Sequence, residues 1–262
     1  MTVNEERATS FGTVAESYDR VRPSPPPEAL DWLLPPDCSV AVDLGAGTGL
    51  FTRALARRVE HVVAVEPDER MREVLTARSP DSQVLAGRAE AIPLPDGYAD
   101  AVLVSTAWHW FDLGQAVTEI ARVLKDGGRL GVLWTSRDRA VAWVADLEVI
   151  GYPGEPRTRD EVRERLSRQH TVTLPAGTEF GSVESASFGF TRMISVADTL
   201  DWLATASQVI AADPAERDAG LARARATLLA RAGHSEMVEM PVRSWCWRAD
   251  RLARAGASAR RT

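Results

Sequence analysis

Cysteine is scarce in this chain, and Cys38 and Cys246 are the only two among 262 residues. Two cysteines cannot build the disulfide framework that stabilises many small secreted proteins. Neither of them lies in the close spacing of a metal site, so we expect no bound metal. The low cysteine count therefore excludes disulfide-stapled classes of protein.

Long apolar runs and a basic leader are also missing. No uncharged apolar stretch reaches the roughly 18 residues that a membrane span needs. The first ten residues, MTVNEERATS, lack the basic-then-apolar pattern of a signal peptide. We therefore predict a cytoplasmic protein that has no membrane partner.

Lysine is almost absent, because Lys125 is the single lysine among 31 lysine and arginine residues. With arginine as the default basic residue, an arginine here says little about an anion site. The 37 acidic residues give a formal net charge of −6, which argues against a nucleic-acid partner. A hydrophobic content of 45% excludes a disordered chain.

Apolar strands alternate with helical patterns over the first half of the chain. The pattern predicts strands at 39–44, 61–65, 83–86, 99–105 and 129–134, and helices at 50–58, 68–77 and 113–124. Such alternation indicates a mostly parallel sheet covered by helices on both faces. Later strands at 183–191 and 238–248 bring the predicted total to seven.

Helical patterns dominate the two flanks of this core. Helices are predicted at 11–18, 28–34, 141–150, 159–169, 196–205 and 214–231. We expect four regions: an N-terminal helical cap (1–36), a ligand-binding core (37–136), the remaining strands with helical insertions on the substrate side (137–250), and a flexible tail (251–262). The oligomeric state cannot be read from the pattern.

A glycine-rich turn follows the first predicted strand, with glycines at positions 45, 47 and 49. A dinucleotide fingerprint would need its third glycine at position 50, which is Leu50, and no Gly-Lys-Ser/Thr follows to make a P-loop. Asp43 ends the strand and would repel a phosphate but attract a cation. Glu66 ends the second strand, where a carboxylate can accept both hydroxyls of a ribose. The pattern therefore predicts a binding site for a cationic nucleoside such as S-adenosylmethionine.

Four stretches extend this pattern. They are Asp43 to Gly49, Glu66-Pro67-Asp68, Gly87 to Pro95 with Asp96-Gly97 and Asp100, and Arg122 to Gly128. In this order they resemble motifs of the class I S-adenosylmethionine-dependent methyltransferases of the methyltransferase type 11 family. The segments Phe11-x-x-x-Ala15-x-x-Tyr18 and Trp108-His109-Trp110 are most similar to small-molecule enzymes such as the trans-aconitate methyltransferases.

This resemblance implies a Rossmann-like seven-stranded fold, S-adenosyl-L-methionine as cofactor and a set of contact residues. Cofactor contacts are implied for Tyr18, Asp43, Gly45, Ala46, Gly47, Glu66, Pro67, Met71, Ala89 and Ser105. Glu66 would hold the ribose, Pro67 and Met71 would cover the adenine face, and the N–H of Ala89 would bind the adenine ring. Arg88 departs from the pattern, because many relatives carry an acid there that accepts from the adenine amino group.

The aromatic stretch after the fourth strand provides candidate substrate residues. We expect Trp108, Trp110 and Trp134 to line a substrate pocket. His109 is a candidate general base, since its ordinary pKa is near neutral; the simpler alternative is a histidine bonded to the backbone.

We therefore expect methyl transfer to a small-molecule acceptor, with a carboxylate or hydroxyl oxygen favoured as the methylated atom. One alternative is a non-catalytic protein that binds S-adenosylmethionine or S-adenosylhomocysteine. A second is a nicotinamide oxidoreductase, against which Leu50 argues.

Overall fold

The computed structural model describes residues 19–151, 158–161, 164 and 171–253. The helix predicted at 11–18, with Tyr18, lies outside these residues, as does most of the helix predicted at 159–169. Within the described ranges, no helix is both long enough and apolar enough to cross a membrane.

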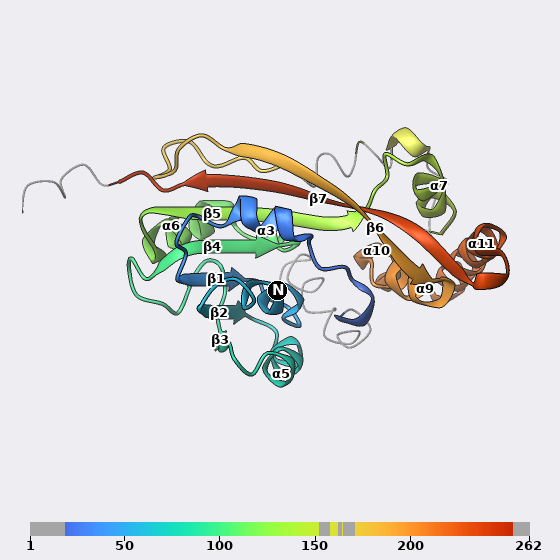
Figure 1. Cartoon of the computed structure of the whole chain (residues 1–262), viewed down its shortest axis with the longest axis horizontal. Coiled ribbons are helices and arrows are strands. Elements are labelled where there is room, and N and C mark those ends of the chain that lie inside the picture. The colour runs from blue at the N-terminus through green and yellow to red at the C-terminus, as the bar shows by residue number, and fades with distance from the viewer. Residues whose placement is uncertain (1–18, 152–157, 162–163, 165–170, 254–262) are drawn as a thin grey trace, which may run out of the picture. The chain divides into compact units, whose positions relative to one another are not determined.

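Seven strands form one sheet in the order β3-β2-β1-β4-β5-β7-β6 (Figure 1). The strands are β1 Val40–Leu44, β2 His61–Glu66, β3 Gln83–Ala86, β4 Ala99–Ser105, β5 Leu124–Arg137, β6 Glu184–Ser195 and β7 Met237–Asp250. Strands β1 to β5 pair in parallel. Strand β7 runs antiparallel to β5, because Arg251 bonds to Gly128 while Asp138 bonds to Pro241. The predicted mostly parallel seven-stranded fold is confirmed.

Helices connect and flank these strands. They are α3 Pro27–Leu33, α4 Leu50–Leu55, α5 Glu69–Arg78, α6 Leu113–Val123, α7 Ala142–Gly151, α9 Val196–Ala204, α10 Ser207–Ile210 and α11 Pro214–Ala232. Two short 3-10 helices are η2 Trp108–Trp110 and η3 Gly233–Ser235. Asp68 caps α5 by accepting a hydrogen bond from the Met71 N–H, so the helix begins one residue later than predicted.

Strand β5 is longer than the predicted 129–134. It begins directly after α6 at Leu124, and the register against β4 shifts between Ala99 and Ala101. The pair Gly127-Gly128 lies inside this irregularity, where Gly127 has a φ of 77°. The glycines therefore lie in an irregular part of the strand, whereas the sequence pattern places them between a helix and a strand.

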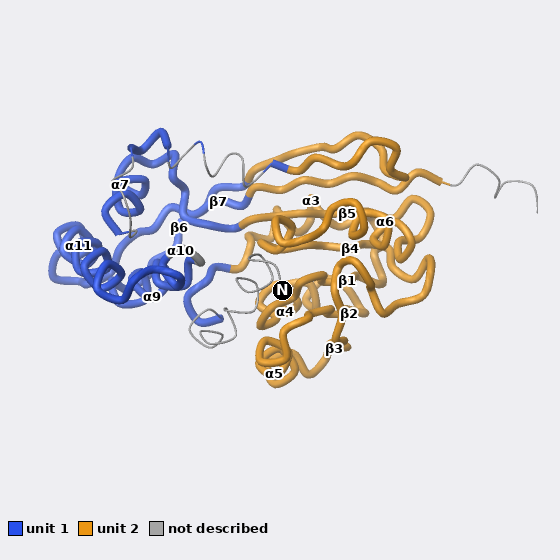
Figure 2. Tube along the Cα trace, turned by 180° about the vertical axis from the view of Figure 1, so that it is seen from behind, with its two compact units in different colours: residues 1–23, 135–171, 188–244 blue, residues 24–134, 172–187, 245–262 orange. Residues whose placement is uncertain are grey.

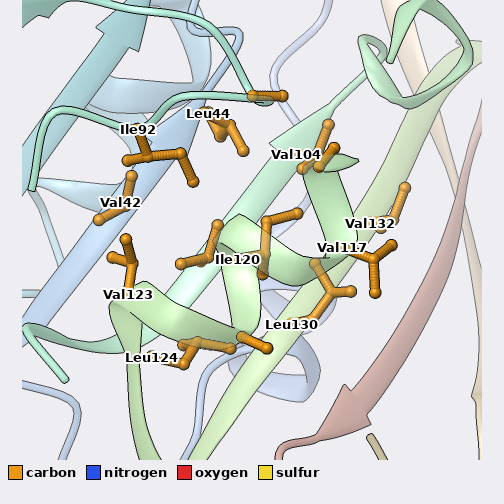
Figure 3. Close-up of a cluster of buried hydrophobic side chains, with 14 of the residues drawn as sticks. Val42, Leu44, Ile92, Val104, Val117, Ile120, Val123, Leu124, Leu130 and Val132 are labelled. Atoms are coloured by element: carbon orange, nitrogen blue, oxygen red, sulfur yellow. The ribbon is translucent and has the colours of Figure 1, made fainter. Parts of the chain in front are cut away.

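The chain forms two compact units, shown in different colours in Figure 2. One unit comprises residues 24–134, 172–187 and 245–262 and contains the whole of strands β1 to β4. In its core, Val117 and Ile120 of α6 pack with Val42, Val104 and Val132 of three neighbouring strands (Figure 3). This apolar layer packs α6 against β1, β4 and β5.

The other unit comprises residues 1–23, 135–171 and 188–244 and has its own apolar core. Trp202 and Leu203 of α9 lie there with Leu147 of α7 and Leu228 of α11. Both units are interleaved in sequence, and the four-region division expected from the sequence stays a prediction.

Candidate functional site

The glycine turn lies where the strand order reverses. Strand β1 pairs with β2 on one side and with β4 on the other, and ligands of open α/β sheets bind outside the carboxyl ends of the strands at such a point. Gly45, Gly47 and Gly49 all have positive φ values, of 73°, 57° and 82°. A Cβ atom at Gly45 would lie 2.7 Å from the Cβ of Ala107, whereas one at Gly47 would meet no described atom within 4 Å. The turn is therefore packed at Gly45 and open at Gly47.

Asp43 is fully buried beside this turn, one residue before the end of β1. Its Oδ2 accepts a hydrogen bond of 2.6 Å from the Thr52 hydroxyl of α4. Its Oδ1 is buried and has no hydrogen-bond partner among the described residues. Burial raises the pKa of Asp43 to about 7, with the Thr52 hydrogen bond opposing the rise and the charge of Glu66 adding to it. A buried carboxylate oxygen without a partner favours a cationic ligand.

Glu66 ends β2 and reaches back to the glycine turn. Its Oε2 accepts from the Gly47 N–H at 2.8 Å, and its Oε1 accepts from the Asp68 N–H at 2.9 Å. Burial raises the pKa of Glu66, while these two backbone hydrogen bonds lower it. Each carboxylate oxygen has a second lone pair, so Glu66 can also accept hydrogen bonds from a diol.

The loop after β4 packs against the same turn. Ala107 and Phe111 are the nearest neighbours of a side chain built at Gly45. Thr106, at the start of this loop, has a φ of 61°, which is a strained conformation for a β-branched residue. The loop backbone is therefore held tightly where β4 ends.

His109 lies in η2 of this loop, and the centroid of its ring is 4.5 Å from the ring centroid of Trp110. Its Nδ1 is buried and has no hydrogen-bond partner within the described part of the chain. Burial lowers the pKa of His109 to about 4, so the imidazole is neutral at pH 7. The backbone-bonded alternative considered for His109 receives no support at Nδ1.

The structure brings five of the predicted cofactor residues together and places most of the others on neighbouring elements. Asp43, Gly45, Ala46, Gly47 and Glu66 meet at the turn, where the N–H groups of Gly45 and Ala46 also donate to the Val65 carbonyl. Most of the others lie on neighbouring elements as follows: Pro67 and Met71 at the start of α5, Ala89 after β3, Ser105 at the end of β4, and Trp110 in η2.

Two predicted pocket residues are core side chains in this structure. Trp108 is 3% exposed and packs edge-on against Phe111, and Trp134 is 2% exposed and packs edge-on against Trp247. Ala89 is 4% exposed and also belongs to this core. Their predicted roles in binding stay predictions.

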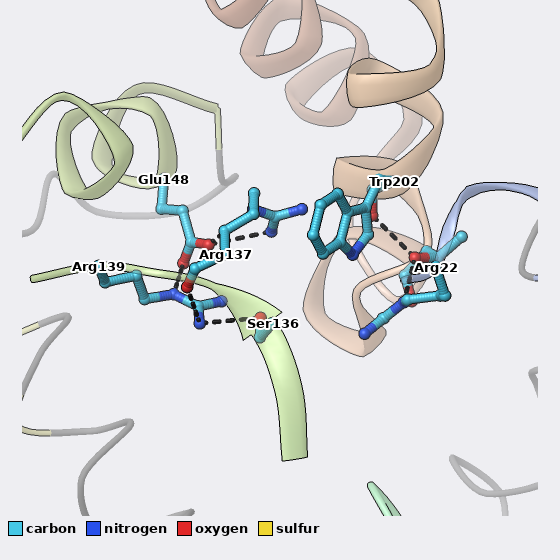
Figure 4. Close-up of polar contacts among 7 residues, drawn as sticks. Arg22, Ser136, Arg137, Arg139, Glu148 and Trp202 are labelled. Atoms are coloured by element: carbon cyan, nitrogen blue, oxygen red, sulfur yellow. Dashed lines mark hydrogen bonds and ion pairs between the residues drawn. The ribbon is translucent and has the colours of Figure 1, made fainter. Parts of the chain in front are cut away.

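Sequence reasoning missed a buried ionic cluster in the other unit (Figure 4). Arg137 and Arg139 both donate hydrogen bonds to Glu148, and the Arg137 guanidinium lies 4.6 Å from the Trp202 ring centroid. Burial alone would raise the pKa of Glu148, but the two arginines outweigh it and hold this pKa below its ordinary range. Since arginine is the default basic residue in this chain, no sequence signal marks these two.

Thr52 was also missed, because a threonine inside a helical pattern gives no sign of where its hydroxyl points. No three His, Cys, Asp or Glu side chains gather as a metal site within the described ranges. The donors and acceptors at the turn therefore suit an organic ligand that carries positive charge and hydroxyl groups.

Comparisons with known proteins agree with this geometry. Residues 42–132 match the family model described as "Methyltransferase domain". An uncharacterised methyltransferase of Mycobacterium tuberculosis is 43% identical over 224 residues, which cover 85% of this chain and 87% of the relative. An uncharacterised methyltransferase-like protein of Schizosaccharomyces pombe is 35% identical over 193 residues, covering 71% of this chain and 73% of the relative.

Among solved structures, a candidate type II methyltransferase from Anaeromyxobacter dehalogenans superposes with a TM-score of 0.67 at 25% identity. The match covers 88% of this chain and 99% of that one.

Proposed function

The chain belongs to the S-adenosylmethionine-dependent methyltransferases, and we propose that it methylates a small molecule, with an oxygen atom of the acceptor as the nucleophile. The observation that carries the cofactor site of this proposal is the buried Oδ1 of Asp43, which has no hydrogen-bond partner among the described residues and lies beside the glycine turn. A non-catalytic protein that binds the same cofactor is the alternative that the experiment below separates.

The residues at the turn fit S-adenosylmethionine. The cofactor is a cation that carries a ribose diol, and Asp43 and Glu66 offer the matching anion and hydrogen-bond acceptor. Gly47 leaves space that a side chain would otherwise fill.

Roles follow for the residues that line the turn. Gly45, Ala46 and Gly47 would hold the methionine part of the cofactor, and Glu66 the ribose. Pro67 and Met71 would cover the adenine, while the Ala89 N–H would bind its edge. Ser105 and Tyr18 complete the proposed cofactor contacts, with Trp108, Trp110 and Trp134 proposed on the acceptor side.

When bound, the cofactor supplies a methyl group activated on a sulfonium, so the protein mainly aligns the donor with the acceptor and excludes water. Alignment of this kind can contribute about 7–11 kcal/mol to the lowering of a barrier.

His109 bears on which oxygen is methylated. An effective general base has a pKa near the working pH, and the pKa of about 4 makes the buried imidazole a weak base. A carboxylate acceptor has no proton to lose and therefore suits this site better than a hydroxyl. If the acceptor is a hydroxyl, Nδ1 of His109 is the proposed atom that takes its proton.

The test uses the full chain in two steps. Isothermal titration calorimetry with S-adenosylmethionine and S-adenosylhomocysteine measures cofactor binding. Radiolabelled S-adenosylmethionine is then incubated with fractionated metabolite extracts, and labelled products are compared before and after alkaline hydrolysis, which cleaves methyl esters. Transfer to a small, base-labile product supports the proposal. Binding without transfer to any fraction supports the non-catalytic alternative, and no binding refutes both.

A further inference from the structure

Helix α4 turns one hydroxyl group toward the buried acid of the site. Thr52 is fully buried, and its Oγ1 donates to Asp43 Oδ2 across 2.6 Å. The backbone N–H of Thr52 also acts to lower the pKa of Asp43. Because Oδ2 is occupied in this way, Oδ1 is the oxygen of Asp43 that has no partner among the described residues.

Within the described part of the chain, the other charged groups near Asp43 offer it no counter-charge. Glu66 on β2 is itself acidic. Arg53 on α4 is directed elsewhere, since its Nη1 donates to the Thr48 carbonyl at 3.0 Å. On β4 the only charged residue is Asp100, which bonds to Ser39 and Val40 at the amino end of β1. His109, in the loop after β4, is neutral at pH 7.

We propose that Thr52 is a positioning residue for cofactor binding: its hydroxyl orients the Asp43 carboxyl group by occupying Oδ2 and leaves Oδ1 for the cation of the cofactor. This inference rests on the proposed function, because the cation is that of S-adenosylmethionine. Thr52 itself touches neither the cofactor nor the acceptor in this proposal.

The pKa of Asp43 makes this role of Thr52 measurable. With its pKa at about 7, the carboxyl group is near half-ionised at neutral pH, so a modest change at Thr52 alters the charged fraction strongly. A hydrogen bond to a charged group is strong enough that its loss raises a carboxyl pKa by about one to two units.

The test compares Thr52→Val, which keeps the shape and loses the hydroxyl, with Thr52→Ser, which keeps the hydroxyl. Carbon-13 NMR titration of the ligand-free proteins reports the Asp43 pKa, and its signal is assigned with Asp43→Asn. Calorimetry measures S-adenosylmethionine affinity from pH 6 to pH 9. We expect Thr52→Val to raise the Asp43 pKa by about one to two units and to weaken binding roughly tenfold at pH 7, with recovery near pH 9. Thr52→Ser should follow the natural protein.

Two results would overturn the inference. One is an unchanged Asp43 pKa in Thr52→Val, and the other is an affinity loss of equal size at every pH, which would mark a purely structural role. If thermal unfolding shows that Thr52→Val does not fold, Thr52→Ala carries the same expectations. Absence of binding by the natural protein at all pH values would refute the proposed function, whereas the ligand-free titration would still decide the Thr52–Asp43 coupling.

Discussion

Glu66 and Gly47 are joined by a hydrogen bond of 2.8 Å from the Gly47 N–H to a carboxylate oxygen. They are 19 residues apart in sequence and come from different crossovers of the sheet. The second oxygen of Glu66 accepts from the Asp68 N–H, where α5 begins. One acid therefore holds the glycine turn and the start of a helix in fixed positions.

The first prediction concerns this bridge. Glu66→Gln leaves one of the two N–H donors facing an amide nitrogen, so we expect S-adenosylmethionine affinity to fall about 10- to 100-fold. Calorimetry measures the loss. Glu60→Gln is the matched control, because Glu60 lies on the surface just before the same strand. Equal affinities for Glu66→Gln and Glu60→Gln would contradict the assignment of Glu66.

The second prediction separates two glycines of the turn. Gly45→Ala meets both a positive φ and the Cβ of Ala107, whereas Gly47→Ala meets only the positive φ. We expect Gly47→Ala to lower the free energy of unfolding by about 1–2 kcal/mol and Gly45→Ala to lower it by more. Urea denaturation without ligand measures both. A larger loss of stability for Gly47→Ala than for Gly45→Ala would show that Ala107 moves easily to accommodate a side chain at position 45.

The same pair also tests the binding site. Because a Cβ atom at Gly47 would meet no described atom within 4 Å, Gly47→Ala should weaken S-adenosylmethionine binding more than its effect on stability suggests. Unchanged affinity in a folded Gly47→Ala protein would place the ligand elsewhere.

The third prediction concerns the buried cluster of Arg137, Arg139 and Glu148. Glu148→Gln leaves two buried guanidinium groups without their anion, and we expect a loss of about 3–5 kcal/mol in the free energy of unfolding at pH 7. Asp146→Asn, two residues away in α7, breaks only an exposed ion pair with Arg159 and should cost less than about 1 kcal/mol.

The destabilisation caused by Glu148→Gln should depend on pH in one direction. The pKa of Glu148 is lower in the folded chain than in the unfolded chain, so its stabilisation is present above the ordinary glutamate pKa and is lost as the pH falls through the folded value. The difference in the free energy of unfolding between the natural protein and Glu148→Gln should therefore become smaller below about pH 4. A difference in the free energy of unfolding that does not vary with pH would mean that Glu148 is not charged in the folded protein.

The fourth prediction uses His109 to identify the acceptor. With a hydroxyl acceptor, His109→Ala should lower turnover roughly 10²- to 10⁴-fold and leave cofactor affinity unchanged. With a carboxylate acceptor, the loss should stay well below that range. Steady-state kinetics with the acceptor found by the labelling screen decides between them. In the natural protein, any loss of rate due to His109 should occur as the pH falls toward about 4, where the ring becomes charged.

Much of the fold could be read from local patterns. Strands 83–86 and 99–105 begin and end where predicted, because short apolar runs bounded by turns are local properties of the sequence. Strand β5 was predicted too short, since a glycine pair can follow the end of a helix or lie in an irregular part of a strand equally well. Which of the two occurs depends on the neighbouring strand β4.

The sequence by itself determined the glycine turn, the order of strands and helices, and the acids at the ends of β1 and β2, because dihedral preference and hydrophobic period act over a few residues. Only the tertiary structure decided which buried polar atoms meet: Thr52 with Asp43, Gly47 with Glu66, and Arg137 with Glu148. Those pairings depend on how distant segments pack, and packing decides which polar group loses water and therefore needs a partner.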